Sequence, residues 1–147
     1  MPDIRGDIGV HNFWKQGQAG VFDVRVTDTD APSQRDADPH TVLERHERSK
    51  KRKYLEPCLA RGRSFTPLVF SADGLFGKEA TAAIRRLACA LALKWQRQYS
   101  DVVGYARARL SLALVRANSR CLRAERCPLW RSQQPAWSGG DGLVYFQ

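Results

Sequence analysis

Alternating apolar and polar residues mark two strands near the start of the chain. Between residues 21 and 27 every second side chain is apolar, and this period of two predicts a strand with one apolar and one polar face. A shorter alternation over residues 7–10 predicts an earlier strand, and the Gln- and Gly-rich stretch 14–20 predicts that the two form an antiparallel pair. The apolar set of the longer strand is Phe22, Val24 and Val26, and its polar set is Asp23, Arg25 and Thr27.

Helical spacing follows, interrupted by one more strand. Asp38-Pro39 has the form of an N-cap followed by proline at the first helical position, so it predicts a helix over residues 40–60 that kinks or ends early, near Pro57. The apolar segment 64–71 predicts a third strand, in which Pro67 favours a sheet edge or the entry to the strand. Two amphipathic helices are predicted next, over residues 78–98 and from Asp101 onwards. Their apolar stripes are Ala83, Ile84, Leu87, Leu91 and Trp95 in the first, and Val103, Ala106, Leu110, Ala113, Leu114, Ala117 and Cys121 in the second.

The order of these elements predicts an α/β fold. A strand, a helix and a further strand imply a right-handed crossover with partly parallel pairing. We therefore expect a small mixed sheet of three or four strands covered by helices. The 147 residues suit one domain, which we place at residues 1–124. Residues 125–147 are rich in Pro, Trp, Ser and Gly, and they are predicted to form a disordered tail.

Composition narrows the class of protein. The chain is 43% hydrophobic and 27% charged, which is typical of a folded globular domain. No run approaches the roughly 18 apolar residues of a membrane span, and no secretory leader is recognised, so we expect no membrane partner and a nuclear or cytoplasmic location. The four cysteines and three histidines lack the spacing of a zinc site, and free buried thiols are expected.

Charge is divided unevenly along the chain. The net charge of +9 favours an anionic partner, although a role in solubility would explain it equally well. Residues 1–38 hold seven acids and four bases, whereas residues 39–147 hold eight acids and twenty bases. The early acids are all aspartates, which could hold a divalent metal beside a phosphate-binding surface. The alternative is that most of them are turn residues and helix caps.

Two of these aspartates form a candidate metal site. Asp7 lies on or at the end of the first predicted strand, and Asp23 lies on the second, where Arg25 shares its face. Aspartates on adjacent strands can share Mg²⁺ or Mn²⁺, because such ions need only one or two carboxylates besides water and phosphate oxygens. Arg25 would then stabilise the attacking water or the charge on the phosphate. Aspartates on the polar face of a strand also occur commonly without a metal.

Four strings along the chain resemble one nuclease family. They are RGDI at residues 5–8, FDVRVTDTDA at 22–31, KKRKYL at 50–55 and FTPLV at 65–69. With the order of strands and helices, they resemble the PD-(D/E)XK restriction-endonuclease-like domain found C-terminal to the reverse transcriptase in non-LTR retrotransposon polyproteins, over roughly residues 4–124. The resemblance implies a restriction-endonuclease-like fold and a metal-dependent DNA endonuclease of retroelement origin.

The resemblance also assigns individual residues. It makes Asp7 and Asp23 the ligands of Mg²⁺ or Mn²⁺, and it puts Arg25 where the family has its lysine. Because arginine stays protonated and cannot act as a base, Lys53, in a Lys-x-x-Lys-Tyr pattern like that of the family, is the candidate for a compensating lysine. The family's first core helix is missing, so we expect a fragment or degenerate copy, with a reverse transcriptase portion or a second copy of itself as partner.

Basic residues supply a candidate nucleic-acid surface. The run 45–53 spans more than one face of its helix, and the last predicted helix is rich in arginine, which favours contact with the phosphate backbone of DNA or RNA. A solvated surface and a nuclear-localisation signal are the alternatives for the run. The candidate contacts are Arg48, Lys50, Lys51, Arg52, Arg107 and Arg116.

Two other functions stay open beside the endonuclease. A non-catalytic nucleic-acid-binding module would keep the basic surface without the metal chemistry. A partner-interaction domain would use the Ala-rich helix 78–98 as its interface.

Overall fold

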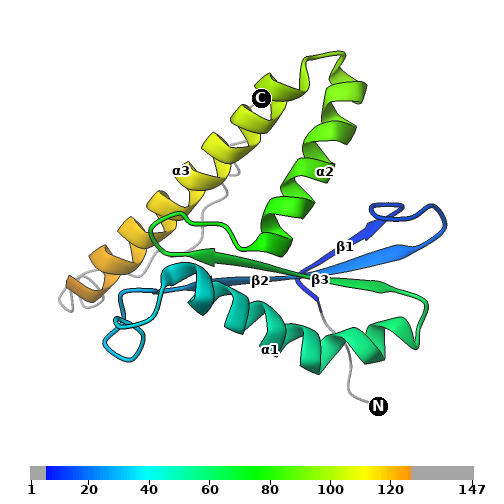
Figure 1. The fold of residues 1–147 in the computed structure, drawn as a ribbon. Coiled ribbons are helices and arrows are strands. Elements are labelled where there is room, and N and C mark those ends of the chain that lie inside the picture. The colour runs from blue at the N-terminus through cyan, green and yellow to red at the C-terminus, as the bar shows by residue number, and fades with distance from the viewer. Residues whose placement is uncertain (1–5, 127–147) are drawn as a thin grey trace, which may run out of the picture.

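A three-stranded sheet with helices on both faces forms the centre of the molecule (Figure 1). The computed structural model describes residues 6–126, so the predicted tail lies almost entirely outside the described residues. The elements are β1 (Ile8–His11), β2 (Ala19–Thr27), α1 (Pro39–Leu59), β3 (Ser64–Ser71), α2 (Lys78–Trp95) and α3 (Tyr99–Arg126). Among these elements no helix has the length and apolar character of a membrane span.

The sheet is mixed, as the sequence predicts. Its strand order is β1-β2-β3, in which β1 runs antiparallel and β3 parallel to β2. Ile8 pairs with Phe22, and Asp23 pairs with Pro67. The α/β class and the edge position of the strand that carries Pro67 are therefore confirmed.

Each face of the sheet is covered by a different set of helices. Helix α1 lies on one face, whereas α2 and α3 lie on the other, with α3 packed against α2 (Figure 1). One buried cluster, on the α1 side, consists of Val21, Cys58 and Phe65; the other, on the α2 side, consists of Phe70, Ala80 and Ile84. Consequently α1 and α3 cannot form one continuous basic surface across a shared face of the sheet.

Helix α1 begins and ends close to the predicted limits of residues 40–60. The carboxylate of Asp38 accepts a hydrogen bond from the Thr41 backbone N–H at 3.0 Å, and Pro39 follows this cap as the first helical residue. The helix continues through Pro57 to Leu59, so the early end expected near Glu56 does not occur. A proline in the last turn removes a single backbone hydrogen bond, which the rest of the helix can tolerate.

The segment after β3 folds back along that strand. The Ser71 N–H donates to the Leu75 carbonyl at 2.9 Å, and the Gly77 N–H donates to the Val69 carbonyl at 2.9 Å. Phe70 and Phe76 form an antiparallel bridge, and their rings meet edge to face. This return segment covers part of the outer edge of β3.

The apolar stripes of α2 and α3 are narrower than predicted. In α2, Ala83 and Ile84 are buried, but Leu87 and Trp95 are exposed. In α3, Ala106, Leu110 and Leu114 pack against the buried cluster beside α2, whereas Ala113, Ala117 and Cys121 are exposed. A helix that packs on a neighbouring helix and one strand end buries only residues one turn apart, so the remainder of a broad stripe stays in solvent. Among the described cysteines, the expected free buried thiol is confirmed for Cys58, whereas Cys89 and Cys121 are free but exposed; Cys127 lies outside the described residues.

Candidate functional site

A row of polar side chains fills the space between β2 and α1. Asp23, Arg25 and Thr27 are half-buried, while Val24 and Val26 on the opposite face are 40% and 48% exposed. The alternation predicted from the sequence is present, but it is the polar face of β2 that the helix covers. Burial of this polar face is possible because helix α1 presents polar side chains of its own toward the strand.

Asp23 is paired with Lys50 from α1. The ammonium of Lys50 contacts Asp23 Oδ2, and the two side chains are only 22% and 15% exposed. Oδ2 is buried and has no partner among the described residues besides this ammonium, so the ion pair compensates its charge. Charges held this far from solvent interact more strongly than an exposed pair and are costly to separate.

Asp7 lies next to Asp23 across the antiparallel ladder. The pairing of Ile8 with Phe22, extended by one residue, puts Asp7 opposite Asp23. The exposed Asp7 carboxylate accepts a hydrogen bond from the Val24 backbone N–H at 2.7 Å. Standard backbone dimensions then keep that oxygen within about 5 Å of the Asp23 Cα atom. The structure therefore brings together the two aspartates that the resemblance names as metal ligands.

Among the described residues, the pair of aspartates has no third ligand of the usual kinds. Within residues 6–123 there is no group of three or more His, Cys, Asp or Glu side chains that could hold a metal ion. A magnesium ion, however, takes one or two carboxylates and completes its shell with water and phosphate oxygens. Two neighbouring carboxylates, Asp7 exposed and Asp23 paired with Lys50, fit that limited requirement.

His46 is a member of this polar row that the sequence analysis missed. Its Nε2 lies 3.3 Å from Thr27 Oγ1. Burial is the main cause that lowers the pKa of His46, and the charges of Arg25 and Arg45 lower it further, which favours the neutral form of the ring. The available signal was helical spacing, since Leu43, His46 and Lys50 lie at i, i+3 and i+7 and share the buried side of α1.

Lys50, and not the predicted Lys53, is the lysine on Asp23. Lys53 is exposed, and its ammonium lies 5.0 Å from the centroid of the Tyr54 ring. Tyr54 turns inward to pack on Phe65, with ring centroids 5.5 Å apart. Adjacent helical residues point about 100° apart, so Lys53 is directed away from the strand when Tyr54 faces it. Lys50 lies one turn before Tyr54 on the same side of the helix.

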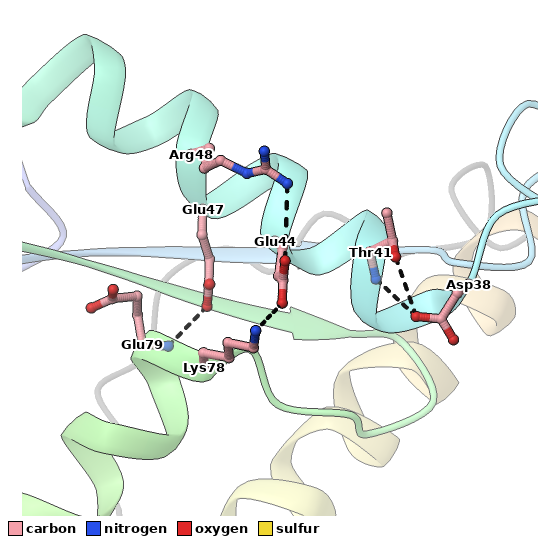
Figure 2. A network of polar contacts seen from close by, with 7 residues as sticks. All are labelled: Asp38, Thr41, Glu44, Glu47, Arg48, Lys78 and Glu79. Atoms are coloured by element: carbon pink, nitrogen blue, oxygen red, sulfur yellow. Dashed lines mark hydrogen bonds and ion pairs between the residues drawn. The ribbon is translucent and has the colours of Figure 1, made fainter.

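A second polar network ties α1 to the start of α2 (Figure 2). Glu47 accepts a hydrogen bond from the Glu79 backbone N–H at 3.0 Å, and Lys78 forms an ion pair with Glu44. Lys51 forms another ion pair, with the Glu79 carboxylate. Burial, as the largest cause, raises the pKa of Glu47. Gly77 makes the approach feasible, because a Cβ there would lie 2.1 Å from Glu47 Oε1.

The ion pairs separate the six residues predicted to contact nucleic acid into two groups. Lys50 and Lys51 are engaged by carboxylates of their own chain, so their assignment to nucleic-acid binding is not supported by their positions. Arg107 and Arg116 are exposed on α3, across the sheet from α1. Arg48 and Arg52 are exposed on the outer side of α1.

The arginines of α1 line an open pocket. Its volume is about 450 Å³, and its lining consists of Thr41, Arg45, Arg48, Ser49 and Arg52. One guanidinium nitrogen of Arg48 is 3.9 Å from Glu44, a loose and exposed pairing. Three guanidinium groups beside two hydroxyl groups suit a phosphate, because arginine binds oxyanions through several N–H donors.

Comparison with known proteins identifies no relative of this chain. No protein-family model, no curated protein and no solved structure matches the chain. The fold is thus an α/β arrangement of a three-stranded mixed sheet and its helices, and any nuclease relationship rests on the four sequence strings.

Proposed function

We propose that this chain is a metal-dependent DNA endonuclease of retroelement origin that hydrolyses phosphodiester bonds. The observation that carries the proposal is the half-buried pair of Asp23 and Lys50, with the Asp7 carboxylate beside it on the neighbouring strand. Two carboxylates and a lysine are also the residue types that the resemblance calls for. Here the lysine comes from the crossover helix, whereas the strand position holds Arg25.

Asp7 and Asp23 would hold Mg²⁺ or Mn²⁺. When bound, such an ion supplies a polarised phosphate and a water of lowered pKa. Asp7 presents an exposed carboxylate at the surface end of the site, where a DNA phosphate can approach. Lys50 positions Asp23 and contributes fixed positive charge next to it, which favours the extra negative charge of the transition state. Arg25, two residues along the same strand face, adds a second cation.

The arginine pocket of α1 supports the same proposal through substrate binding. Arg45, Arg48 and Arg52 are outside the Asp23 site and could engage the phosphate backbone. The same pocket favours a second function, in which the chain binds nucleic acid without cleaving it. In that case the ion pair of Asp23 with Lys50 would be purely structural.

Nicking of supercoiled plasmid tests the proposal. We expect Mg²⁺- or Mn²⁺-dependent nicking by the wild-type chain, loss to background in Asp23→Asn, and a strong reduction in Lys50→Met. Asp73→Asn, at an exposed turn, and Lys53→Met are the matched controls and should retain activity. Absence of nicking with either metal, or equal nicking by Asp23→Asn, would overturn it. Plasmid binding that EDTA leaves unchanged, without nicking, would establish the binding module instead.

A further inference from the structure

Helix α3 carries a row of exposed apolar side chains. Tyr105, Leu112, Val115 and Leu122 are 55%, 54%, 60% and 56% exposed. Together with the exposed Ala108 and Ser119, they follow one another at alternating intervals of three and four residues. This is the spacing of positions a and d in a heptad repeat, sustained over almost three heptads. We call these six residues the α3 seam.

The α3 seam points away from the rest of the domain. The helix packs on its own sheet and on α2 through Ala106, Leu110 and Leu114. At about 100° per residue, the seam lies roughly 170° around the helix from that packed side. Within residues 6–123 no buried cluster includes a seam residue, although the Tyr105 ring touches Trp95 edge to face. Exposed apolar residues in a continuous line differ from isolated ones, because a line can be buried by one partner helix.

Arginine flanks the α3 seam along one side. Arg109, Arg116 and Arg123 occupy the three successive e positions, and all are exposed. On the other side, the g positions hold Ser111 and Asn118, and the Asn118 amide donates to the Ala72 carbonyl of the same chain. Residues at e and g decide which helix pairs with a coiled-coil seam, through charge.

Self-pairing is disfavoured by these flanks. An antiparallel pair of α3 helices would set e positions against e positions, and arginine would face arginine. A parallel pair would set Arg109, Arg116 and Arg123 opposite the g positions of the preceding heptads, which are Gly104, Ser111 and Asn118 and carry no negative charge. A second copy of this chain therefore offers no acidic side chain to pair with the arginines that flank the seam.

We propose that the α3 seam binds an amphipathic helix of another protein, with apolar residues at its a and d positions and Asp or Glu at its flanking positions. Leu112 and Val115 form the apolar centre of this interface, and Arg109 and Arg116 select the acidic partner. The seam is on the side of the sheet that α2 covers, whereas the Asp23 site is under α1. The interface is therefore a property beyond the proposed cleavage function and independent of it.

Fluorescence anisotropy with two synthetic peptides tests this interface on the full chain. Both labelled peptides contain four heptads with Leu at a and d; one has Glu at every e and g position and the other has Lys. We expect the acidic peptide to bind and the basic peptide not to bind. Leu112→Gln with Val115→Gln should weaken binding by at least about tenfold, the loss expected for residues at the centre of an interface. Leu93→Gln, at a residue of α2 that is 83% exposed, is the control and should bind normally.

Reversing the charge of the flanking arginines gives a second and more specific test of the interface. Arg109→Glu with Arg116→Glu should reverse the preference, so that the basic peptide binds and the acidic one does not. Thermal unfolding by circular dichroism confirms that each variant is folded. Binding of neither peptide, equal binding of both, or unchanged binding by the Leu112/Val115 variant would overturn the proposal. A dimer in sedimentation that dissociates in that variant would assign the seam to a second copy. If a DNA duplex displaced the acidic peptide, and if the Leu112/Val115 variant bound both the duplex and the peptide as tightly as the wild type does, the surface would be assigned to nucleic acid.

Discussion

Helices α1 and α3 are both long and basic, yet their positive charges are used differently. On α1, Lys50 and Lys51 are held by Asp23 and Glu79. On α3, the five arginines between residues 107 and 123 are exposed, and none of them forms an ion pair with another described side chain. The difference comes from what each helix packs against, since α1 faces a strand and a helix start that carry carboxylates. Basic sequence runs of similar appearance can therefore be structural in one helix and free for binding in another.

The largest effect is expected when one apolar residue from each helix is replaced by alanine and the two losses of stability are compared. Leu43 on α1 is 1% exposed, whereas Leu112 on α3 is 54% exposed. Leu43→Ala should lower the free energy of unfolding by about 2–5 kcal/mol, because it removes buried contacts and leaves a cavity. Leu112→Ala should change it by less than about 0.5 kcal/mol. Urea denaturation of both variants measures this, and similar losses would mean that the α3 seam is buried in solution.

The next test separates two lysines on α1. Lys50→Met leaves the buried Asp23 oxygen without its charge partner, so we expect a loss of about 1–3 kcal/mol in the free energy of unfolding. Lys53→Met removes only an exposed ammonium near the Tyr54 ring and should change stability by less than about 0.5 kcal/mol. Equal effects in urea denaturation would contradict the structural role given to Lys50.

Salt dependence of DNA binding tests which cations of α1 are free. Arg48→Gln with Arg52→Gln should reduce the slope of log binding constant against log salt by about two, roughly one for each lost phosphate contact. Lys51→Gln should leave the slope unchanged, because its ammonium is held by Glu79. Filter binding over a range of salt concentrations gives the slopes. A larger change from Lys51→Gln than from the arginine pair would reverse the assignment.

The smallest expected effect concerns pH and the tie between α1 and α2. Burial raises the pKa of Glu47, although the Glu79 N–H and the charge of Lys51 oppose this. A carboxyl group with a raised folded pKa stabilises the fold below its unfolded pKa, and this contribution is lost as pH rises through the folded value. Glu47→Gln should therefore gain stability relative to wild type as pH rises from below 4.5 toward neutrality. Thermal unfolding across this range measures the difference, and parallel curves would contradict it.

Much of the fold was predictable because its signals are local. Alternation identified β2, the Asp38-Pro39 cap identified the start of α1, and Pro67 indicated an edge strand. The width of the α3 stripe was not predictable in this way. It depends on how much of α3 reaches the sheet, and sequence periodicity does not encode that amount.

The candidate site was predictable in its acids and not in its lysine. Strand periodicity and order were enough to relate Asp7 to Asp23. The lysine depends on the rotation of α1 about its own axis, which is fixed by Leu43 and Tyr54 facing the sheet. Once those inward residues are known, His46 and Lys50 follow from helical spacing.

The folded-back segment after β3 has a consequence for how this molecule can associate. An open strand edge invites another chain to add a strand, which leads to aggregation. On β3 this is opposed twice, since Val69 and Ser71 already bond to residues 75–77 and Pro67 has no N–H to offer. The other edge, β1, is only four residues long. The sheet is thereby protected against edge-to-edge polymerisation, and orderly assembly is left to the helical surfaces.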